Sequence, residues 1–172
     1  MTRRDFYQAG TVLLGGLIGL VLTVPGVAYL LSPLRKGSEG KEEFESLTRL
    51  SQLKVGEPRS FAIIADTMDA WVRYPREPIG SVWLVKQADG TVSAFTAECP
   101  HLGCAINLGA DGKSFLCPCH TSIFDFEGKR RNKVSPRSMD SLAVELTKDA
   151  DPIVKVKFER FRTQSEEKIP LV

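Results

Sequence analysis

All of the cysteines and histidines, the residues that most often bind soft metals, lie in one short stretch of this chain. The 172 residues contain four cysteines and two histidines. They are Cys99, His101, Cys104, Cys117, Cys119 and His120. Residues with unrelated structural roles would be scattered along the sequence. Their clustering therefore predicts a metal site, a disulfide, or both.

The six residues form two motifs, Cys99-Pro100-His101-Leu102-Gly103-Cys104 and Cys117-Pro118-Cys119-His120-Thr121-Ser122. Each motif offers a thiolate and an imidazole, so two turns together can supply four ligands. A hairpin around Asp111-Gly112 would bring the turns together. Zinc and an iron–sulfur cluster are both candidates, but zinc fingers space paired cysteines about two to four residues apart and pair their histidines separately. Zinc would also leave two cysteines unexplained.

The two motifs resemble the cluster-binding boxes of the Rieske family in ligand types, spacing, prolines and order, most closely over residues 97–140. The resemblance implies one [2Fe–2S] cluster, with Cys99 and Cys117 on one iron and His101 and His120 on the other. Replacing two thiolates by neutral imidazoles raises the reduction potential. The resemblance also implies a disulfide between Cys104 and Cys119, which fits an oxidising compartment.

The resemblance assigns roles to residues around the cluster as well. Ser122 matches the family serine that donates to a bridging sulfide, and Leu102 matches the exposed leucine that meets quinone or cytochrome. Pro136 matches the family's proline loop, although residues 134–138 lack the usual Gly-Pro pair. Phe124 occupies a position where many high-potential members have a hydrogen-bonding tyrosine. Because phenylalanine cannot donate, we expect a lower potential, suited to menaquinol.

An anchored Rieske domain with a disulfide is similar to the iron–sulfur subunit of a bacterial cytochrome bc complex, a quinol–cytochrome c reductase. This resemblance implies a subunit that is not catalytic alone. It would take one electron from quinol and pass it to a c-type cytochrome, beside a cytochrome b subunit in a dimeric complex. His120 or His101 would contact quinol and couple its proton to the electron.

Other functions remain open at this point. The small Rieske subunit of an arsenite-oxidase-type molybdoenzyme can carry the same N-terminal features, whereas a ferredoxin would usually lack both anchor and disulfide. A Rieske oxygenase needs a further domain with mononuclear iron, for which no ligands remain. A zinc-binding structural domain is the non-redox alternative. Near-balanced charge, +2 overall, argues against a nucleic-acid partner.

The N-terminal segment predicts a membrane anchor. The run from Ala9 to Leu31 has no charged residue and reaches about 34 Å as a helix, enough for a bilayer core of about 30 Å. A cleaved signal peptide would have a shorter apolar run. Arg3-Arg4 before this run resembles a twin-arginine export signal. We expect a single pass through the cytoplasmic (inner) membrane, with the N-terminus inside and the head on the outer, periplasmic side.

The rest of the chain predicts a polar linker followed by β-structure. Asp89-Gly90 between Ser81–Lys86 and Thr91–Thr96 is a hairpin signal, and residues 142–146 and 153–158 alternate apolar with polar side chains. We predict an all-β Rieske head, with antiparallel sheets and an inserted cluster-binding subdomain, after one transmembrane helix. The expected divisions are residues 1–8 (export segment), 9–31 (anchor), 32–45 (linker) and 46–172 (Rieske domain).

Overall fold

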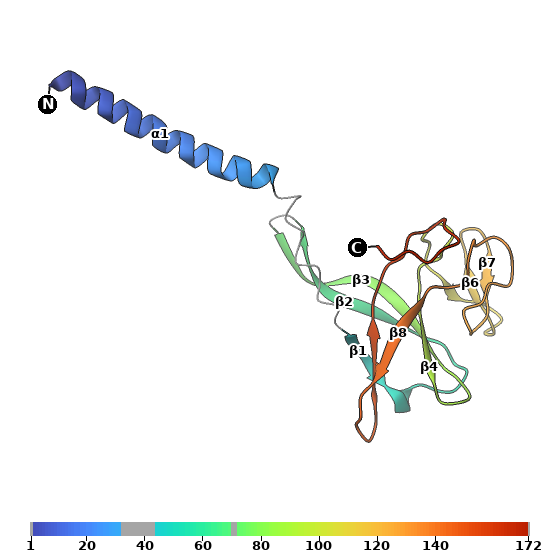
Figure 1. Ribbon diagram of the computed structural model, residues 1–172. Helices are drawn as coiled ribbons and strands as arrows, with labels where there is room; N and C mark the ends of the chain where they lie inside the picture. The colour runs from blue at the N-terminus through green and yellow to red at the C-terminus, as the bar shows by residue number, and fades with distance from the viewer. Residues whose placement is uncertain (1, 32–43, 70–71, 172) are drawn as a thin grey trace. The chain divides into compact units, whose positions relative to one another are not determined.

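The computed structural model describes residues 2–31, 44–69 and 72–171 (Figure 1). Contacts between Cα atoms divide the chain into two compact units, residues 1–41 with 68–72, and residues 42–67 with 73–172. Most of the linker predicted for residues 32–45 lies outside the described residues. Its last two residues do not belong to a linker, because the first strand begins at Phe44.

The N-terminal helix, α1, spans Arg3–Leu30 and includes Pro25. It is long and apolar enough to cross a membrane. The helix begins before Ala9, the first residue of the predicted anchor, because Thr2 and Asp5 form a capping box. The Thr2 hydroxyl accepts the Asp5 N–H at 3.3 Å, and the Asp5 carboxylate accepts the Thr2 N–H at 2.9 Å. The paired arginines therefore lie within the first turn of the helix.

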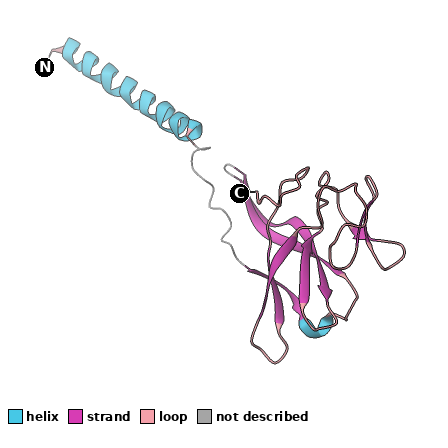
Figure 2. Ribbon diagram, turned by 45° about the vertical axis from the view of Figure 1, so that its right-hand side comes forward, coloured by secondary structure: helices cyan, strands magenta, loops and turns pink. Residues whose placement is uncertain are grey.

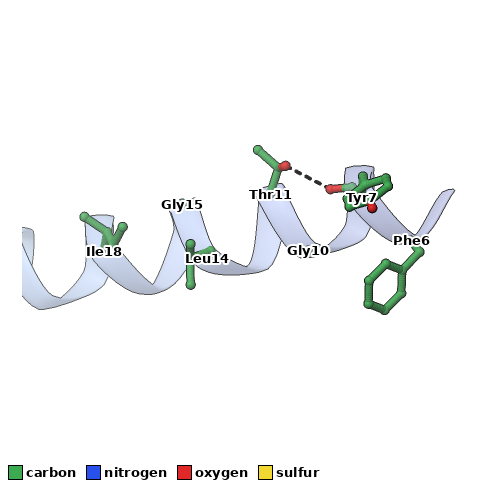
Figure 3. Close-up of a pocket in the computed structure, with 7 residues that line it drawn as sticks. All are labelled: Phe6, Tyr7, Gly10, Thr11, Leu14, Gly15 and Ile18. Atoms are coloured by element: carbon green, nitrogen blue, oxygen red, sulfur yellow. Dashed lines mark hydrogen bonds between the residues drawn. The ribbon is translucent and has the colours of Figure 1, made fainter. Parts of the chain in front are cut away.

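One face of α1 carries a shallow, mostly apolar groove over Gly10 and Gly15 (Figure 3). Phe6, Leu14 and Ile18 are among its lining side chains. The Thr11 hydroxyl donates to the Tyr7 carbonyl at 2.8 Å, so this polar group is already satisfied within the helix. The groove therefore offers close approach to the helix backbone without an unsatisfied hydroxyl.

The head contains a six-stranded sheet with strand order β1-β9-β8-β4-β3-β2 and a three-stranded sheet with order β5-β6-β7 (Figures 1 and 2). The large sheet consists of β1 (Phe44–Arg49), β2 (Arg59–Asp69), β3 (Val72–Lys86), β4 (Val92–Thr96), β8 (Ser141–Leu146) and β9 (Ile153–Lys157). The small sheet consists of β5 (Asn107–Leu108), β6 (Phe115–Cys117) and β7 (Ser122–Phe124). A 3-10 helix, η2 (Leu50–Gln52), follows β1. The predicted class of fold, antiparallel sheets with a separate small subdomain, is confirmed.

Both predicted hairpins are present. Val82 to Lys86 pair antiparallel with Val92 to Thr96, and Gly90 between them has φ +86°, a conformation that glycine adopts without steric cost. The small sheet places Asn107 opposite Leu116 across the Asp111-Gly112 turn. In this turn the Asp111 carboxylate accepts the backbone N–H groups of Lys113 and Ser114.

The head has two apolar cores, and the second takes side chains from both sheets, including Val85 of β3 and Phe95 of β4. The large-sheet core contains buried Leu53, Ile63, Val82, Leu84, Ala94, Leu142, Val154, Val156 and Phe161. The second core contains Val85, Phe95, Cys99, Ile106, Phe115, Cys117, Phe124 and Met139. Trp83 connects β3 to the small subdomain by donating from Nε1 to the Ile106 carbonyl at 2.9 Å. Two of the predicted ligands are therefore part of a packed core.

Candidate metal centre

The first loop, residues 99–104, begins shortly after β4. The Cys99 N–H donates to the Cys104 carbonyl and the Gly103 N–H donates to the Cys99 carbonyl, each at 2.8 Å. Gly103 has φ +78°, which most other residues adopt only at a cost. These backbone bonds close a tight turn that presents His101 and leaves Leu102 exposed.

The second loop, residues 117–122, joins β6 to β7. Cys117 and Ser122 face each other as the last paired residues of the two strands, so His120 is presented from a short hairpin loop. Thr121, which follows His120, has φ +58°. Its hydroxyl donates to the His120 carbonyl at 2.7 Å. The small sheet thus determines where the second thiol and the second imidazole can lie.

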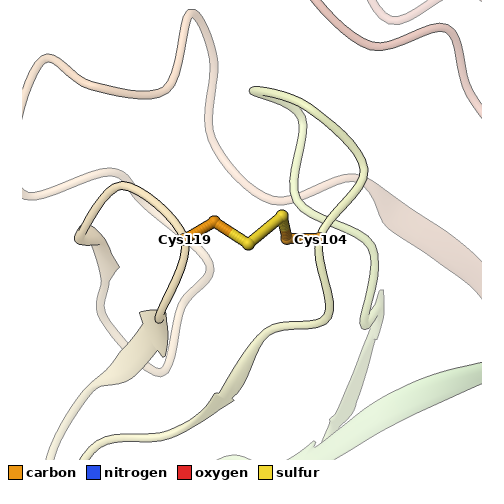
Figure 4. Close-up of a disulfide and its surroundings, with 2 residues drawn as sticks. All are labelled: Cys104 and Cys119. Carbon is orange, nitrogen blue, oxygen red and sulfur yellow. A yellow bond between two sulfur atoms is a disulfide. The ribbon is translucent and has the colours of Figure 1, made fainter.

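A disulfide joins Cys104 of the first loop to Cys119 of the second, as the family resemblance implies (Figure 4). The Sγ atoms of Cys104, Cys117 and Cys119 lie within 4.8 Å of one another. This trio is not a metal site, because two of its sulfurs are bonded to each other. The disulfide instead lies against Cys117 and fixes the distance between the two loops.

Cys99 and Cys117 are the two free cysteines, and both are buried. Burial raises the pKa of the Cys99 thiol above its usual value, and the neighbouring Cys117 side chain raises it further. The His101 backbone N–H and the nearby Ser122 hydroxyl lower the pKa of Cys99 in part. A buried thiol in this environment stays protonated unless a cation favours the thiolate, which is what a metal centre would do.

The two imidazoles of the loops lie side by side. The ring centroids of His101 and His120 are 4.9 Å apart, with an angle of 81° between the planes. His101 is half-buried and His120 is exposed. The structure therefore gathers one pair of thiols and one pair of imidazoles from two loops.

Two buried polar atoms near these thiols and imidazoles lack a hydrogen-bond partner in the described part of the chain, namely His101 Nδ1 and Ser122 Oγ. Leaving such atoms unpaired is costly in a folded protein. A buried imidazole nitrogen that has no hydrogen-bond partner is suited to bind a metal. A buried hydroxyl beside Cys99 that has no partner is suited to donate a hydrogen bond to a cluster sulfide. The donor set of this site suits the [2Fe–2S] cluster.

The other predicted residues also have clear positions. Phe124 is completely buried in the second core and pairs with Phe115 across the small sheet. Leu102 is 45% exposed at the tip of the first loop. Pro136 is half-buried in the third loop, defined here as residues 129–138. Although it lacks the Gly-Pro pair, this loop is stabilised internally, because the Pro136 carbonyl accepts a hydrogen bond from Arg130 of the same loop.

A buried ion pair and a chain segment that were not predicted from the sequence support these loops. Arg137 and Asp140 form an ion pair at 2.7 Å, with side chains 9% and 5% exposed. Arg137 also donates to the Arg162 carbonyl at 2.8 Å, and the Gln164 N–H donates to the Pro100 carbonyl at 2.9 Å. The C-terminal segment thus connects the third loop to the first. Only the opposite charges three residues apart could have indicated the ion pair.

Asn132, which was also not predicted from the sequence, lies between the second and third loops. Its Nδ2 donates to the Thr121 carbonyl at 2.7 Å, and its Oδ1 accepts the Ile123 N–H at 3.3 Å. No local sequence pattern signals these contacts, because the partners come together only in the folded domain.

Comparison with known proteins agrees with this geometry. Residues 46–144 match the family described as "Rieske [2Fe-2S] domain". The chain is 32% identical over 131 residues to the menaquinol:cytochrome c reductase iron–sulfur subunit of Bacillus subtilis (strain 168), covering 74% of this chain and 75% of that protein. It is 30% identical over 160 residues to the cytochrome b6-f complex iron–sulfur subunit of Synechococcus sp. (strain JA-3-3Ab), covering 89% and 86%.

A solved structure of the cyanobacterial plasma membrane Rieske protein PetC3 from Synechocystis PCC 6803 superposes with a TM-score of 0.40 at 29% identity, covering 48% of this chain and 81% of that one. The match to the family covers more than half of the chain, and the similarity to the Bacillus subtilis subunit covers about three quarters of each chain. The chain therefore belongs to the Rieske family, and its domain binds one [2Fe–2S] cluster.

Proposed function

We propose that this chain is the Rieske electron-transfer subunit of a bc-type quinol–cytochrome c reductase that oxidises menaquinol. The observation that carries the proposal is its similarity, over about three quarters of both chains, to a menaquinol:cytochrome c reductase iron–sulfur subunit. A second such subunit, from Geobacillus thermodenitrificans, is 26% identical over 133 residues. The partners would be a cytochrome b subunit, quinol and a c-type cytochrome in a dimeric, membrane-bound complex.

Within this proposal, the Cys99 and Cys117 sulfurs bind one iron and the His101 and His120 imidazoles bind the other. The buried thiols, the adjacent rings and the unpartnered His101 Nδ1 support this ligand set. When bound, the cluster accepts and returns a single electron. The protein would hold the cluster between buried thiols, which are shielded from water, and the solvent-exposed His120.

Quinol contact is assigned to the exposed edge. An imidazole whose outer nitrogen is free of its proton can accept a hydrogen bond from quinol and then the proton itself. His120 is exposed and His101 is half-buried, so His120 is the more accessible of the two. Leu102 lies next to His101 in the chain and offers an apolar surface against which quinone or cytochrome would pack.

The preference for menaquinol rests on the hydrogen bonds available to the cluster. The Ser122 hydroxyl is buried and free to donate, whereas Phe124, completely buried beside the thiols, has no hydroxyl. Hydrogen bonds to cluster sulfurs favour the reduced state because they stabilise its extra negative charge. One donor fewer lowers the potential, which matches the lower potential of menaquinol as electron donor.

The N-terminal helix supplies the membrane anchor in this proposal. Twin-arginine export would leave the N-terminus on the cytoplasmic side and the head on the outer side of the inner membrane. The groove over Gly10 and Gly15 lets a neighbouring transmembrane helix approach closely. In a bc-type complex we expect that neighbour to belong to the cytochrome b subunit.

An EPR-monitored redox titration of the membrane-bound protein tests the proposal. We expect a rhombic Rieske signal after reduction, with a midpoint below the range of ubiquinol-oxidising complexes. Absence of the signal, with zinc found by metal analysis, would refute the cluster ligands. Isolation in mild detergent should also yield b-type and c-type haem, and a molybdopterin enzyme in their place would refute the bc-type assignment.

A substitution separates the role of Phe124 from the rest of the proposal. Phe124→Tyr should raise the midpoint potential, because the new hydroxyl can donate to a ligand sulfur. Phe126→Tyr is the matched control, since Phe126 packs against the same core and contacts the Phe115 ring at 5.3 Å between centroids. Equal shifts in the two variants would contradict the menaquinol argument from Phe124.

A further inference from the structure

The residue after His120 has an unusual backbone conformation for its type. Thr121 has φ +58°, in the left-handed region that β-branched residues rarely occupy because their side chains clash with the backbone. Such conformations persist only where surrounding contacts hold them. The second loop therefore needs an external support next to a proposed ligand.

Asn132 provides that support with both ends of its amide. Nδ2 donates to the Thr121 carbonyl at 2.7 Å and Oδ1 accepts the Ile123 N–H at 3.3 Å. The two contacts lie on either side of Ser122, whose hydroxyl is buried without a partner in the described residues. A single side chain from the third loop thus fixes the backbone of the second loop, which carries the His120 imidazole and the Ser122 hydroxyl.

The third loop has further supports that do not involve Asn132. Arg130 Nη1 donates to the Ser135 carbonyl at 3.0 Å, and the Arg131 N–H donates to the Ile123 carbonyl at 2.7 Å. Loss of the Asn132 amide would therefore leave the third loop in place and release the second loop locally. Lys133, the next residue, is a suitable control, because it is exposed and its side chain has no hydrogen bond or ion pair within the described part of the chain.

We propose that Asn132 is a positioning residue for the cluster: it holds Thr121 in the left-handed conformation and thereby sets the positions of His120 and Ser122. The inference rests on the proposed ligand role of His120. Neighbouring residues that orient metal ligands typically change metal affinity about 10–100-fold when they are removed. We therefore expect the rate of cluster loss to a chelator to rise about tenfold in Asn132→Ala.

The test compares Asn132→Ala, Asn132→Asp and Lys133→Ala in the membrane-bound protein, each with and without Thr121→Gly. The measurements are EPR g-values, midpoint potential at one pH, and iron retained against a chelator. Asn132→Ala should shift the g-values and the midpoint, Asn132→Asp should do so by a smaller amount, and Lys133→Ala should leave both near those of the unsubstituted protein.

The Thr121→Gly background decides the mechanism. Glycine needs no support at φ +58°, so the Asn132→Ala shift should shrink in that background, and iron lost in the single variant should be retained. Unchanged g-values in Asn132→Ala would overturn the positioning role of Asn132. An equal shift in Asn132→Ala whether residue 121 is threonine or glycine would also overturn it, and neither result would affect the proposed cluster ligands. No Rieske signal in the unsubstituted protein would overturn the cluster ligands as well.

Discussion

The first and second loops perform the same task with different means. Both present a cysteine and a histidine, and both contain one residue in the left-handed conformation, Gly103 at φ +78° and Thr121 at φ +58°. In the first loop that residue is glycine and the described supports are backbone hydrogen bonds, including one from Gln164 to Pro100. In the second loop it is threonine, and the support is the Asn132 side chain.

This difference shows where each loop is vulnerable. A conformation held by glycine and backbone bonds depends little on neighbouring side chains, but it depends on the chain segment that supplies the bonds. A conformation held by one amide depends on that side chain alone. We therefore expect the first loop to fail when the C-terminal segment is displaced, and the second loop to fail when Asn132 is replaced.

The largest expected effect comes from the buried ion pair that secures the C-terminal segment. Arg137→Met would leave the Asp140 carboxylate buried without its partner and would release Arg137's contact with the Arg162 carbonyl. Removing one member of a buried pair costs about 3–5 kcal/mol. Denaturant unfolding of the detergent-solubilised chain measures this loss.

Arg130→Met is the matched control for this change, since the exposed Arg130 side chain donates, within the described residues, only to backbone carbonyls, and its loss should cost about 1 kcal/mol. The first loop should lose its order before the second in Arg137→Met, as followed by hydrogen exchange at Gly103 and Ile123. Equal loss of protection at both amides would break the comparison between the loops.

The next effect concerns the bond that both loops share. Cys104→Ala with Cys119→Ala removes the disulfide, which closes a sequence separation of 15 residues. A loop of that length corresponds to about 3 kcal/mol of stability in the chain-entropy description. Thermal unfolding of the full chain should show the loss in the double variant. A reductant should lower the unfolding temperature of the unsubstituted protein toward the same value and leave the double variant unchanged.

The sequence predicted those parts of the fold that depend on local chemistry. The Asp89-Gly90 hairpin and the Asp111-Gly112 turn were predictable because their glycines occur where the chain must adopt positive φ. The predicted strand Ser81–Lys86 was too short, because Pro75 and Pro78 favour an end to the strand. The structure extends β3 back to Val72, and it tolerates the two prolines in the exposed half of the strand, where Arg73 pairs with Asp66.

The candidate site was predictable for a different reason and only in part. Few functions other than metal binding explain cysteines and histidines at this spacing, so their residue types and spacing were sufficient to identify them. Asn132 and Gln164 carry no such signal, because an asparagine in a polar loop and a backbone N–H near the C-terminus acquire their roles through tertiary contacts. Supports of this kind have to be found in the folded structure.

A smaller effect tests the glycine of the first loop. Gly103→Ala would place a Cβ about 3.2 Å from the Glu98 carboxylate oxygen and 3.8 Å from Thr163, positions from which flexible side chains can withdraw. The main cost is the left-handed backbone, about 1–2 kcal/mol for a residue with a Cβ. Denaturant unfolding measures it, with Gly90→Ala, also at positive φ but away from the site, as the control. A cost much larger than that of the control would indicate that Gly103 is restricted by its neighbours as well as by its backbone.

The smallest effect is expected at the matching position of the second loop. Thr121→Gly relieves a left-handed conformation worth about 1–2 kcal/mol, but glycine costs about 0.5–1 kcal/mol in lost chain entropy, and the Thr121 hydroxyl bond to His120 is also lost. The net change should lie within about 1 kcal/mol of zero, whereas Gly103→Ala should destabilise. Denaturant unfolding of both variants under one condition measures the contrast. If Thr121→Gly destabilised the chain as much as Gly103→Ala, the Thr121 side chain would be part of what holds the second loop, and the two loops would differ less in their construction than their hydrogen bonds indicate.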